Sequence, residues 1–304
     1  MKAIKLNRGK IKVFGKKSKL AIKGIAEEHK AFLHNLFTND INNLKPFNFN
    51  YNLRLKGNGH PIDEFFVYNF GDYFLLDTNK TSDFIIQEFT KLKLSLQVSF
   101  EDMSNLAHIY IWGEGADEFV KESFDISLNH FEFAYKNEIL IARNFLRIGE
   151  NGYDLILPEE SLSSIENKLN FVSEEDFEYT RIKNCIPKIG KELKEGYLPL
   201  ETPIYKYAIN FNKGCYVGQE AIARVYFRGK TPRTLVKFKN VENVKEKDKI
   251  INNDKKLGEI TSVCKDLALG YLLRAQIEEN KELTTENGGK VKIIGECSIN
   301  EENS

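Results

Sequence analysis

The chain has 304 residues, of which 41% are hydrophobic and 29% are charged, as in ordinary globular proteins. Its 44 basic and 44 acidic side chains cancel, so no overall field favours nucleic acid or an anionic membrane. No apolar run reaches transmembrane length, and the basic start lacks the apolar core of a signal peptide. We therefore expect a cytoplasmic protein of about two domains, with no membrane or direct nucleic-acid partner.

The first two thirds of the sequence mix helical and strand patterns. Residues 1–20 alternate like a strand, 27–41 read as a helix that stops at Thr38-Asn39-Asp40, and 63–78 read as a hairpin turning at Gly71-Asp72. A helix over 82–96, a strand over 106–115, and a strand followed by a helix over 149–169 come next. This mixed order favours a sheet with helices on one face.

The pattern changes after Arg228. Short strands are predicted at 234–241, 257–263, 267–274 and 290–296, separated by turns rich in lysine, asparagine and glycine. Such a series is typical of a small β-barrel.

The four cysteines are Cys185, Cys215, Cys264 and Cys297, and they are widely separated. The five histidines show no ligand spacing either. We therefore expect neither a disulfide framework nor a metal site.

The stretch "KGCYVGQE", Lys213 to Glu220, is the least ordinary in the chain. Gly214 and Gly218 flank Cys215 and let the backbone approach a ligand closely. A helix starting at Gly218 and the nearby cationic side chains would favour the thiolate form of Cys215. The alternative is that Cys215 is an inert packing residue, and that Gln219 and Glu220 serve only as capping and surface residues.

These eight residues resemble the K-G-C-Y-x-G-Q-E signature of the YgfZ-type folate-binding proteins, relatives of the T-protein (aminomethyltransferase) of the glycine cleavage system. "FLHNLFTNDI", "GNGHPIDEFFVYNFGDYFLLD", "RIKNCIPKIGKEL", and "LGEITSV" with "ALGYLLR" are similar to further segments of that family. The resemblance covers roughly residues 15–275 and departs from the family pattern at Asn35 and at Asn184-Cys185, where glycine is usual.

The resemblance implies an α+β cloverleaf. Residues 1–227 would form a folate-binding, aminomethyltransferase-like region of two lobes, and residues 228–304 a C-terminal β-barrel. A tetrahydrofolate derivative would be the cofactor, bound in the centre. Glu201 would accept hydrogen bonds from the pterin edge, and arginines such as Arg224, Arg228 or Arg233 would hold the glutamate tail.

The same resemblance supplies the remaining candidate site residues. The acidic pair Asp63-Glu64 stands where the T-protein has a pair of aspartates, one of which works beside the folate. Asp63, Glu64 and Cys215 are the candidate catalytic residues, and Cys215 would be reachable from the folate cavity. The signature adds further cofactor-binding candidates: Lys213, Tyr216, Gln219 and Glu220.

Three functions then compete. The favoured one is a tetrahydrofolate-binding accessory protein that supports assembly or repair of iron-sulfur enzymes, including tRNA-modifying ones. The others are a folate-dependent aminomethyl or methyl transferase, and a non-catalytic folate-binding interaction module. The chain offers no set of cysteines for a cluster of its own.

Overall fold

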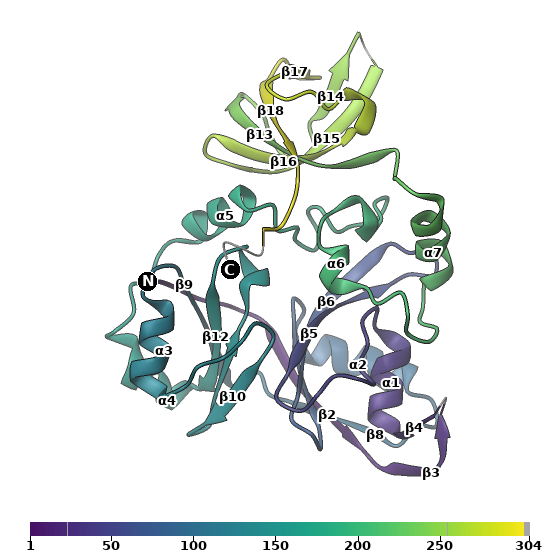
Figure 1. The fold of residues 1–304 in the computed structure, drawn as a ribbon, viewed down its shortest axis with the longest axis vertical. Helices are drawn as coiled ribbons and strands as arrows, with labels where there is room; N and C mark the ends of the chain where they lie inside the picture. The colour runs from purple at the N-terminus through teal and green to yellow at the C-terminus, as the bar shows by residue number, and fades with distance from the viewer. Residues whose placement is uncertain (23, 254, 301–304) are drawn as a thin grey trace.

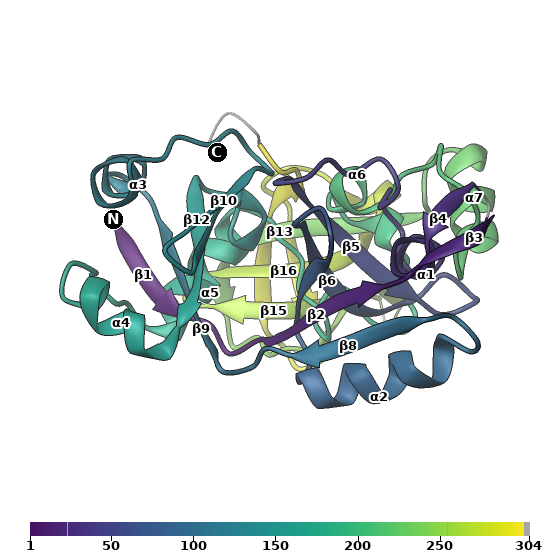
Figure 2. The same cartoon turned by 90° about the horizontal axis from the view of Figure 1, so that it is seen from below.

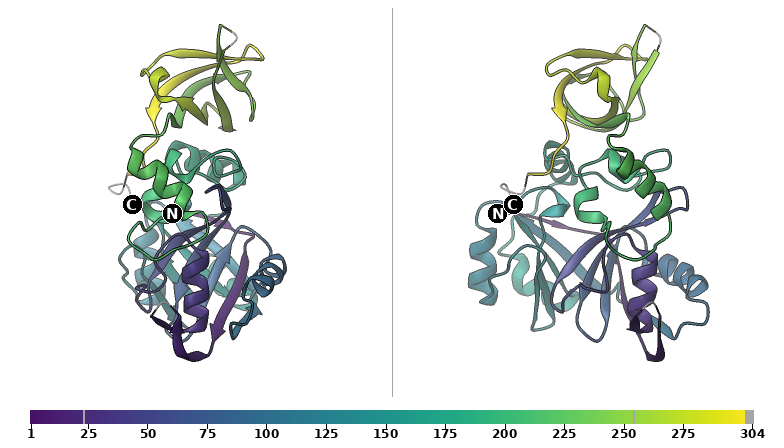
Figure 3. Two further views of the ribbon diagram at one scale, coloured as in Figure 1. Left: turned by 90° about the vertical axis from the view of Figure 1, so that its right-hand side faces the viewer. Right: turned by 45° about the vertical axis from the view of Figure 1, so that its right-hand side comes forward.

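The computed structural model describes residues 1–22, 24–253 and 255–300. Two lobes lie side by side, and a closed barrel stands above them (Figures 1 and 3). The predicted α+β class with a C-terminal barrel is confirmed.

The first lobe is a five-stranded antiparallel sheet in the order β5-β6-β7-β2-β8. Its strands are β2 (Gly9–Gly15), β5 (Phe49–Leu55), β6 (Pro61–Asn69), β7 (Phe74–Thr78) and β8 (Val98–Asp102). Helices α1 (Glu28–Leu36) and α2 (Ser82–Leu92) pack on its outer face, and a small hairpin of β3 (Lys17–Ile22) and β4 (Ile25–Glu27) precedes α1. The predicted helices and the hairpin that turns at Gly71 are thereby confirmed.

The second lobe repeats the plan with the order β1-β9-β12-β11-β10. Its strands are β1 (Lys2–Lys5), β9 (Leu106–Trp112), β10 (Phe133–Lys136), β11 (Ile139–Arg143) and β12 (Gly152–Pro158). Helices α3 (Ala116–Phe124) and α4 (Glu159–Glu166) cover its outer face, as Figure 2 shows from below.

The edge strand β1 lies in the second lobe, although it precedes the first lobe in the chain. At the start of the chain it pairs with β9, with Lys2 opposite Trp112. The strands of the first sheet then follow one another in the chain, ending with β8, which pairs with β2. The chain therefore crosses to the first lobe after β1 and crosses back after β8, when the first sheet is complete.

The inner faces of the two sheets share one hydrophobic core. Aromatic residues from the first sheet, such as Phe49, Phe66 and Tyr68, pack with Phe133 and Ile156 from the second. Burial of this apolar surface is the main favourable term that holds the lobes together.

A short helix, η1 (Phe145–Arg147), lies inside the second lobe between β11 and β12. The segments that join the lobes to the barrel contain α5 (Glu174–Lys183), η2 (Pro199–Glu201), α6 (Tyr205–Ala208) and α7 (Gln219–Arg228). The barrel contains β13 (Arg233–Glu242), β14 (Lys249–Asn252), β15 (Lys255–Cys264), β16 (Leu267–Leu273), β17 (Glu282–Thr285) and β18 (Lys290–Glu296), with η3 (Arg274–Gln276) between β16 and β17. The sequence analysis missed the two four-residue strands, β14 and β17, because so short a run has no clear period.

Candidate functional site

A pocket of about 250 Å³ opens between the lobes and α5. It is lined by residues from nearly every part of the two lobes and their connectors: Leu6, Asn7, Arg8, Tyr51, Glu64, Phe66, Asn79, Leu146, Arg147, Phe177, Glu178, Arg181, Ile186, Pro187, Lys188 and Ile204. We call it the central pocket. Aromatic walls with a few charged groups are the usual make-up of a small-molecule site.

Glu64 is the carboxylate that the first lobe presents to the central pocket. Its Oε1 accepts a hydrogen bond from Arg8 Nη1 at 2.8 Å, and its Oε2 accepts one from Tyr51 OH at 2.9 Å. The Nη2 of Arg8 is buried and has no hydrogen-bond partner within the described part of the chain. A buried donor without a partner is costly, so a ligand acceptor at this point would be favoured.

A buried charge network lies beneath the pocket and joins the two sheets. Arg147 donates to Asp154 Oδ1 at 2.9 Å and also pairs with Asp77, which additionally accepts from Arg8 at 2.8 Å. Arg147 also lies 3.9 Å above the ring of Phe66. One guanidinium thus links β7 of the first lobe, β12 of the second and the aromatic wall of the pocket.

The network keeps its acids ionised although they are fully buried. Burial would raise the pKa of Asp77, but Arg147 and then Arg8 hold it far below its ordinary value. Burial acts likewise on Asp154, and Arg147 with His108 depresses its pKa. Burial lowers the pKa of His108 to about 4, so at neutral pH this imidazole is uncharged.

The pocket rim is built by α5 and the loop that follows it. Glu178 accepts from Arg181 Nη2 at 3.0 Å and from Lys188 Nζ at 2.6 Å. Burial opposes ionisation of Glu178, but the charges of Arg181 and Lys188 lower its pKa. Lys188 is half exposed, which makes it a cation available to an anionic group at the pocket mouth.

The structure separates the two members of the predicted acidic pair. Neighbouring residues of a strand point to opposite faces, so when Glu64 faces the central pocket, Asp63 faces α2. Asp63 is fully buried and accepts two hydrogen bonds from Arg54, whose guanidinium lies 5.9 Å from the ring of Phe89. Asp63 therefore has no access to the central pocket.

Glu201 does not line the central pocket either. Its Oε1 accepts from Arg233 Nε at 2.6 Å, and its Oε2 accepts from the backbone of Leu198 at 2.8 Å. Arg233 also stacks over Tyr197, at 4.2 Å from the ring. These two residues, predicted for the pterin edge and the glutamate tail, here pair with each other at the junction with the barrel.

Lys213 and Tyr216 of the signature have structural partners. The buried Lys213 Nζ donates to the carbonyl oxygens of His34, Phe37 and Asn39, where α1 ends. Unpaired carbonyls at a helix C-terminus favour such a cation. Tyr216 is buried in the shared core, and burial raises its pKa to about 12.

Gly218 starts α7, as the glycine-rich sequence predicts. It has φ of +85°, and a Cβ there would lie 2.5 Å from the carbonyl oxygen of Lys56. Only glycine fits this position, which fixes α7 against the turn between β5 and β6.

Of the other predicted signature residues, Cys215 and Glu220 face solvent and Gln219 is partly buried. Cys215 is exposed and does not line the central pocket. Glu220 and Arg224 form an exposed i,i+4 pair on α7, with Arg224 lining a second cavity that also includes Arg233. Gln219 is the first residue of α7. None of these side chains is brought to the central pocket.

Sequence reasoning missed Arg8, Arg147 and Arg181 as pocket residues. A signal existed for the last one, because Arg181, Ile186, Pro187 and Lys188 all lie in the family-like segment "RIKNCIPK". Arg8 and Arg147 lie outside the family-like segments of the sequence, and they come together only when the two lobes assemble.

Comparison with known proteins places this architecture. The family model described as "GCVT N-terminal domain" matches residues 13–211. The chain belongs to this family.

An uncharacterized protein of Aquifex aeolicus is 54% identical over 149 residues, which cover 48% of this chain and all of that protein. An aminomethyltransferase of Thermoanaerobacter sp. is 26% identical over 233 residues, 70% of this chain and 62% of that enzyme. The tRNA-modifying protein YgfZ of Vibrio atlanticus is 24% identical over 220 residues, 71% of this chain and 65% of that protein. The match thus spans a little under two thirds of these last two relatives.

The crystal structure of glycine cleavage system aminomethyltransferase T from Bartonella henselae has the same fold. It superimposes with a TM-score of 0.81 over 98% of this chain and 86% of that chain, at 15% identity. Together with the relatives named YgfZ, this confirms a YgfZ-type member of the T-protein superfamily.

Within the described residues, no helix combines the length and apolar character needed to cross a bilayer. Across the same part of the chain, no group of three His, Cys, Asp or Glu side chains has the arrangement of a metal site.

Proposed function

We propose that the chain binds a tetrahydrofolate derivative in the central pocket. The observation that carries this proposal is the pairing of Glu64 with a buried Arg8 whose Nη2 lacks a partner among the described residues, within walls formed by Tyr51, Phe66 and Phe177. The amino-pyrimidinone edge of a pterin has both donors, which a carboxylate accepts, and an oxygen acceptor, which a guanidinium satisfies.

The rim offers the second half of a folate site. A folate ends in glutamate carboxylates, and the rim presents Lys188 and, more deeply, Arg181. Glu178 already pairs with both cations, so it would have to share them with the ligand. Bound folate supplies the one-carbon chemistry, while these residues bind and orient it.

We further propose that the protein acts in the cytoplasm as an accessory factor for iron-sulfur enzymes, among them tRNA-modifying ones. The relatives named tRNA-modifying protein YgfZ support this role. Cys215 is exposed beside α7 and away from the central pocket, a position suited to contact with a client protein and not with the pterin. In this role Cys215 contacts the client protein, and Glu64 binds the folate.

A second candidate is folate-dependent aminomethyl transfer, favoured by the relatives named aminomethyltransferase and by Glu64 in the pocket. Asp63 could not take part, since Arg54 holds it on the other side of the sheet. Release of ammonia from an aminomethylated carrier protein on addition of tetrahydrofolate, at roughly one turnover per second or more, would support this candidate over the accessory role.

Calorimetric titration with 5-formyltetrahydrofolate tests the binding site. Loss of one charged acceptor costs about 1 to 3 kcal/mol, so Glu64→Gln is expected to weaken binding about 5- to 150-fold. Glu201→Gln is the matched comparison and tests the sequence-based prediction at the same time. Equal affinity of wild type and Glu64→Gln, with weaker binding by Glu201→Gln, would move the pterin site to Glu201.

A further inference from the structure

Two cysteines that are far apart in the sequence meet where the barrel joins the lobes. Cys185 follows α5, and Cys297 follows β18. They belong to one buried cluster with Ile182, Leu235 and Tyr271. Cys185 also lines the same cavity as Glu296 and Ser298, the two chain neighbours of Cys297. Cys185 and Cys297 are only 2% and 8% exposed, so an external molecule reaches them only through the cavities that they line.

The backbone holds both residues firmly. Cys185 has φ of +62°, a left-handed conformation that glycine adopts at lower cost, and its N–H donates to Ile182. The N–H of Cys297 donates to the carbonyl oxygen of Leu235 on β13, at 2.9 Å.

The surroundings distinguish the two thiols. The neighbouring Cys297 lowers the pKa of Cys185 against the effect of burial, and the charge of Lys237 adds to the lowering. Burial and the neighbouring Cys185 raise the pKa of Cys297. Cys185 is therefore the more readily ionised of the two thiols and the better nucleophile.

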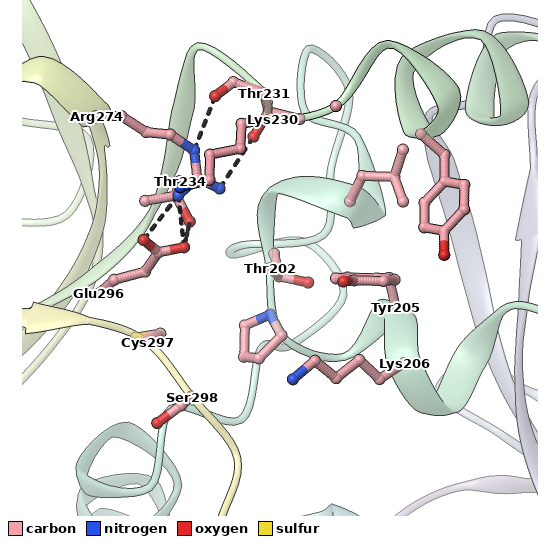
Figure 4. Close-up of a pocket in the computed structure, with 14 residues that line it drawn as sticks. Thr202, Tyr205, Lys206, Lys230, Thr231, Thr234, Arg274, Glu296, Cys297 and Ser298 are labelled. Carbon is pink, nitrogen blue, oxygen red and sulfur yellow. Dashed lines mark hydrogen bonds and ion pairs between the residues drawn. The ribbon is translucent and has the colours of Figure 1, made fainter.

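A cavity reaches each sulfur from its own side. Cys185 lines one of about 410 Å³, together with Lys237 and Ser298. Cys297 lines another of about 380 Å³, shown in Figure 4, where it sits below Glu296 near Thr202 and Ser298. A small disulfide has room to approach the pair through either cavity.

We propose that Cys185 and Cys297 form a reversible disulfide that joins the barrel to the wall of the central pocket. The oxidant is a low-molecular-weight disulfide such as oxidised glutathione. The Cys185 thiolate attacks one of its sulfur atoms and releases one thiolate, which leaves a mixed disulfide. Cys297 then loses its proton and attacks the Cys185 sulfur, which releases the second thiol. The protein loses two hydrogens and two electrons, and one disulfide becomes two thiols.

The bond would act on the proposed folate site, so this consequence rests on the proposed function. Cys185 directly precedes Ile186 and Pro187 in the pocket wall, and the neighbouring Arg181 reaches the barrel through Ser262 at 2.9 Å. A covalent link from Cys185 to the barrel would restrict movement of this wall relative to β13 and β18. The disulfide itself does not depend on folate binding.

The test is a thiol count on the full-length protein, before and after incubation with oxidised glutathione. After oxidation and denaturation, two of the four cysteines are expected to be no longer labelled by a thiol reagent. Mass spectrometry should then find one disulfide-linked peptide that contains Cys185 and Cys297. The melting temperature should rise by about 5 to 10 °C and return on reduction with dithiothreitol. The wild-type mapping needs no variant, so it stands even if a variant folds poorly.

Matched variants assign the bond. Cys297→Ser should keep its remaining thiols free of an intramolecular disulfide, whereas Cys264→Ser and Cys215→Ser should oxidise as the wild type does. Cys264 is the closest control, since it is equally buried and contacts a backbone oxygen of Glu175 at 3.5 Å. Four free thiols after oxidation, or a disulfide that includes Cys215 or Cys264, would overturn the proposal. A disulfide that forms in a protein without folate affinity would sustain this proposal and refute the proposed function.

Discussion

Replacing Arg147 with methionine is expected to destabilise the protein by about 3 to 5 kcal/mol at pH 7, the usual cost of removing one partner of a buried ion pair. The substitution keeps an apolar stem over Phe66 but removes the charge that pairs with Asp77 and Asp154. Both carboxylates are fully buried. In the variant, Asp77 still accepts a hydrogen bond from Arg8, and Asp154 still bonds to His108 and Asn144. The loss of unfolding free energy should therefore stay within that range.

The pH dependence identifies the mechanism. In the wild type both acids have folded pKa values below the unfolded value of about 3.9. Their contribution to stability is therefore complete above about pH 4 and is lost as the pH falls through the folded values. Without Arg147, burial raises the folded-state pKa values of Asp77 and Asp154. Protonation then removes their unfavourable buried charge at a higher pH than in the wild type. The stability gap should therefore narrow as the pH is lowered from 8 to 5.

Urea unfolding at pH 5, 6, 7 and 8 measures this gap. Arg143→Met is the control, because Arg143 is partly exposed and lies 3.9 Å from Asp117; its cost should stay below about 1 kcal/mol. A gap for Arg147→Met that is as small as the control's, or that does not change with pH, would refute the view that one guanidinium keeps two buried acids ionised.

Three further predictions follow from buried or strained groups. Because burial lowers the pKa of His108 to about 4, unfolding free energy should fall between about pH 6.5 and 4, by on the order of 3 kcal/mol, and His108→Gln should flatten this part of the profile. Gly218→Ala should cost about 1 to 3 kcal/mol in urea unfolding, more than Gly113→Ala, where φ is a similar +81° but a Cβ meets nothing within 4 Å. Iodoacetamide at neutral pH should alkylate the exposed Cys215 faster than the three buried cysteines, and folate should not slow it, since Cys215 lies outside the central pocket; protection by folate would place the thiol at the ligand.

The fold was largely accessible from local sequence patterns. Helical spacing located α1 and α2, which bury one face against the first sheet. Aromatic and β-branched runs located β6, β7, β9 and β12, whose residues are almost all buried. The same local patterns predicted one sheet with helices on one face. They carried no information on the pairing of β1 with β9, because the two strands lie about a hundred residues apart in the chain.

The candidate site was much less accessible. Glu64 was identified from the acidic pair, but strand alternation turned Asp63 to the opposite face. Glu201 and Lys213 were predicted to contact the ligand because each is a charged side chain in a family-like segment. The structure gives both charges internal partners, Arg233 for one and three helix-end carbonyls for the other. Sequence shows that a charge is present, but not whether another part of the chain neutralises it.

The position of β1 in the chain has a consequence for synthesis on the ribosome. The second sheet takes its edge strand from the first five residues, whereas the first sheet is complete as soon as β8 has been made. The earliest segment to emerge must therefore wait, unpaired, until β9 has left the exit tunnel. A cut in the gene between β8 and β9 would leave β1 on the first fragment and remove it from the sheet to which it belongs.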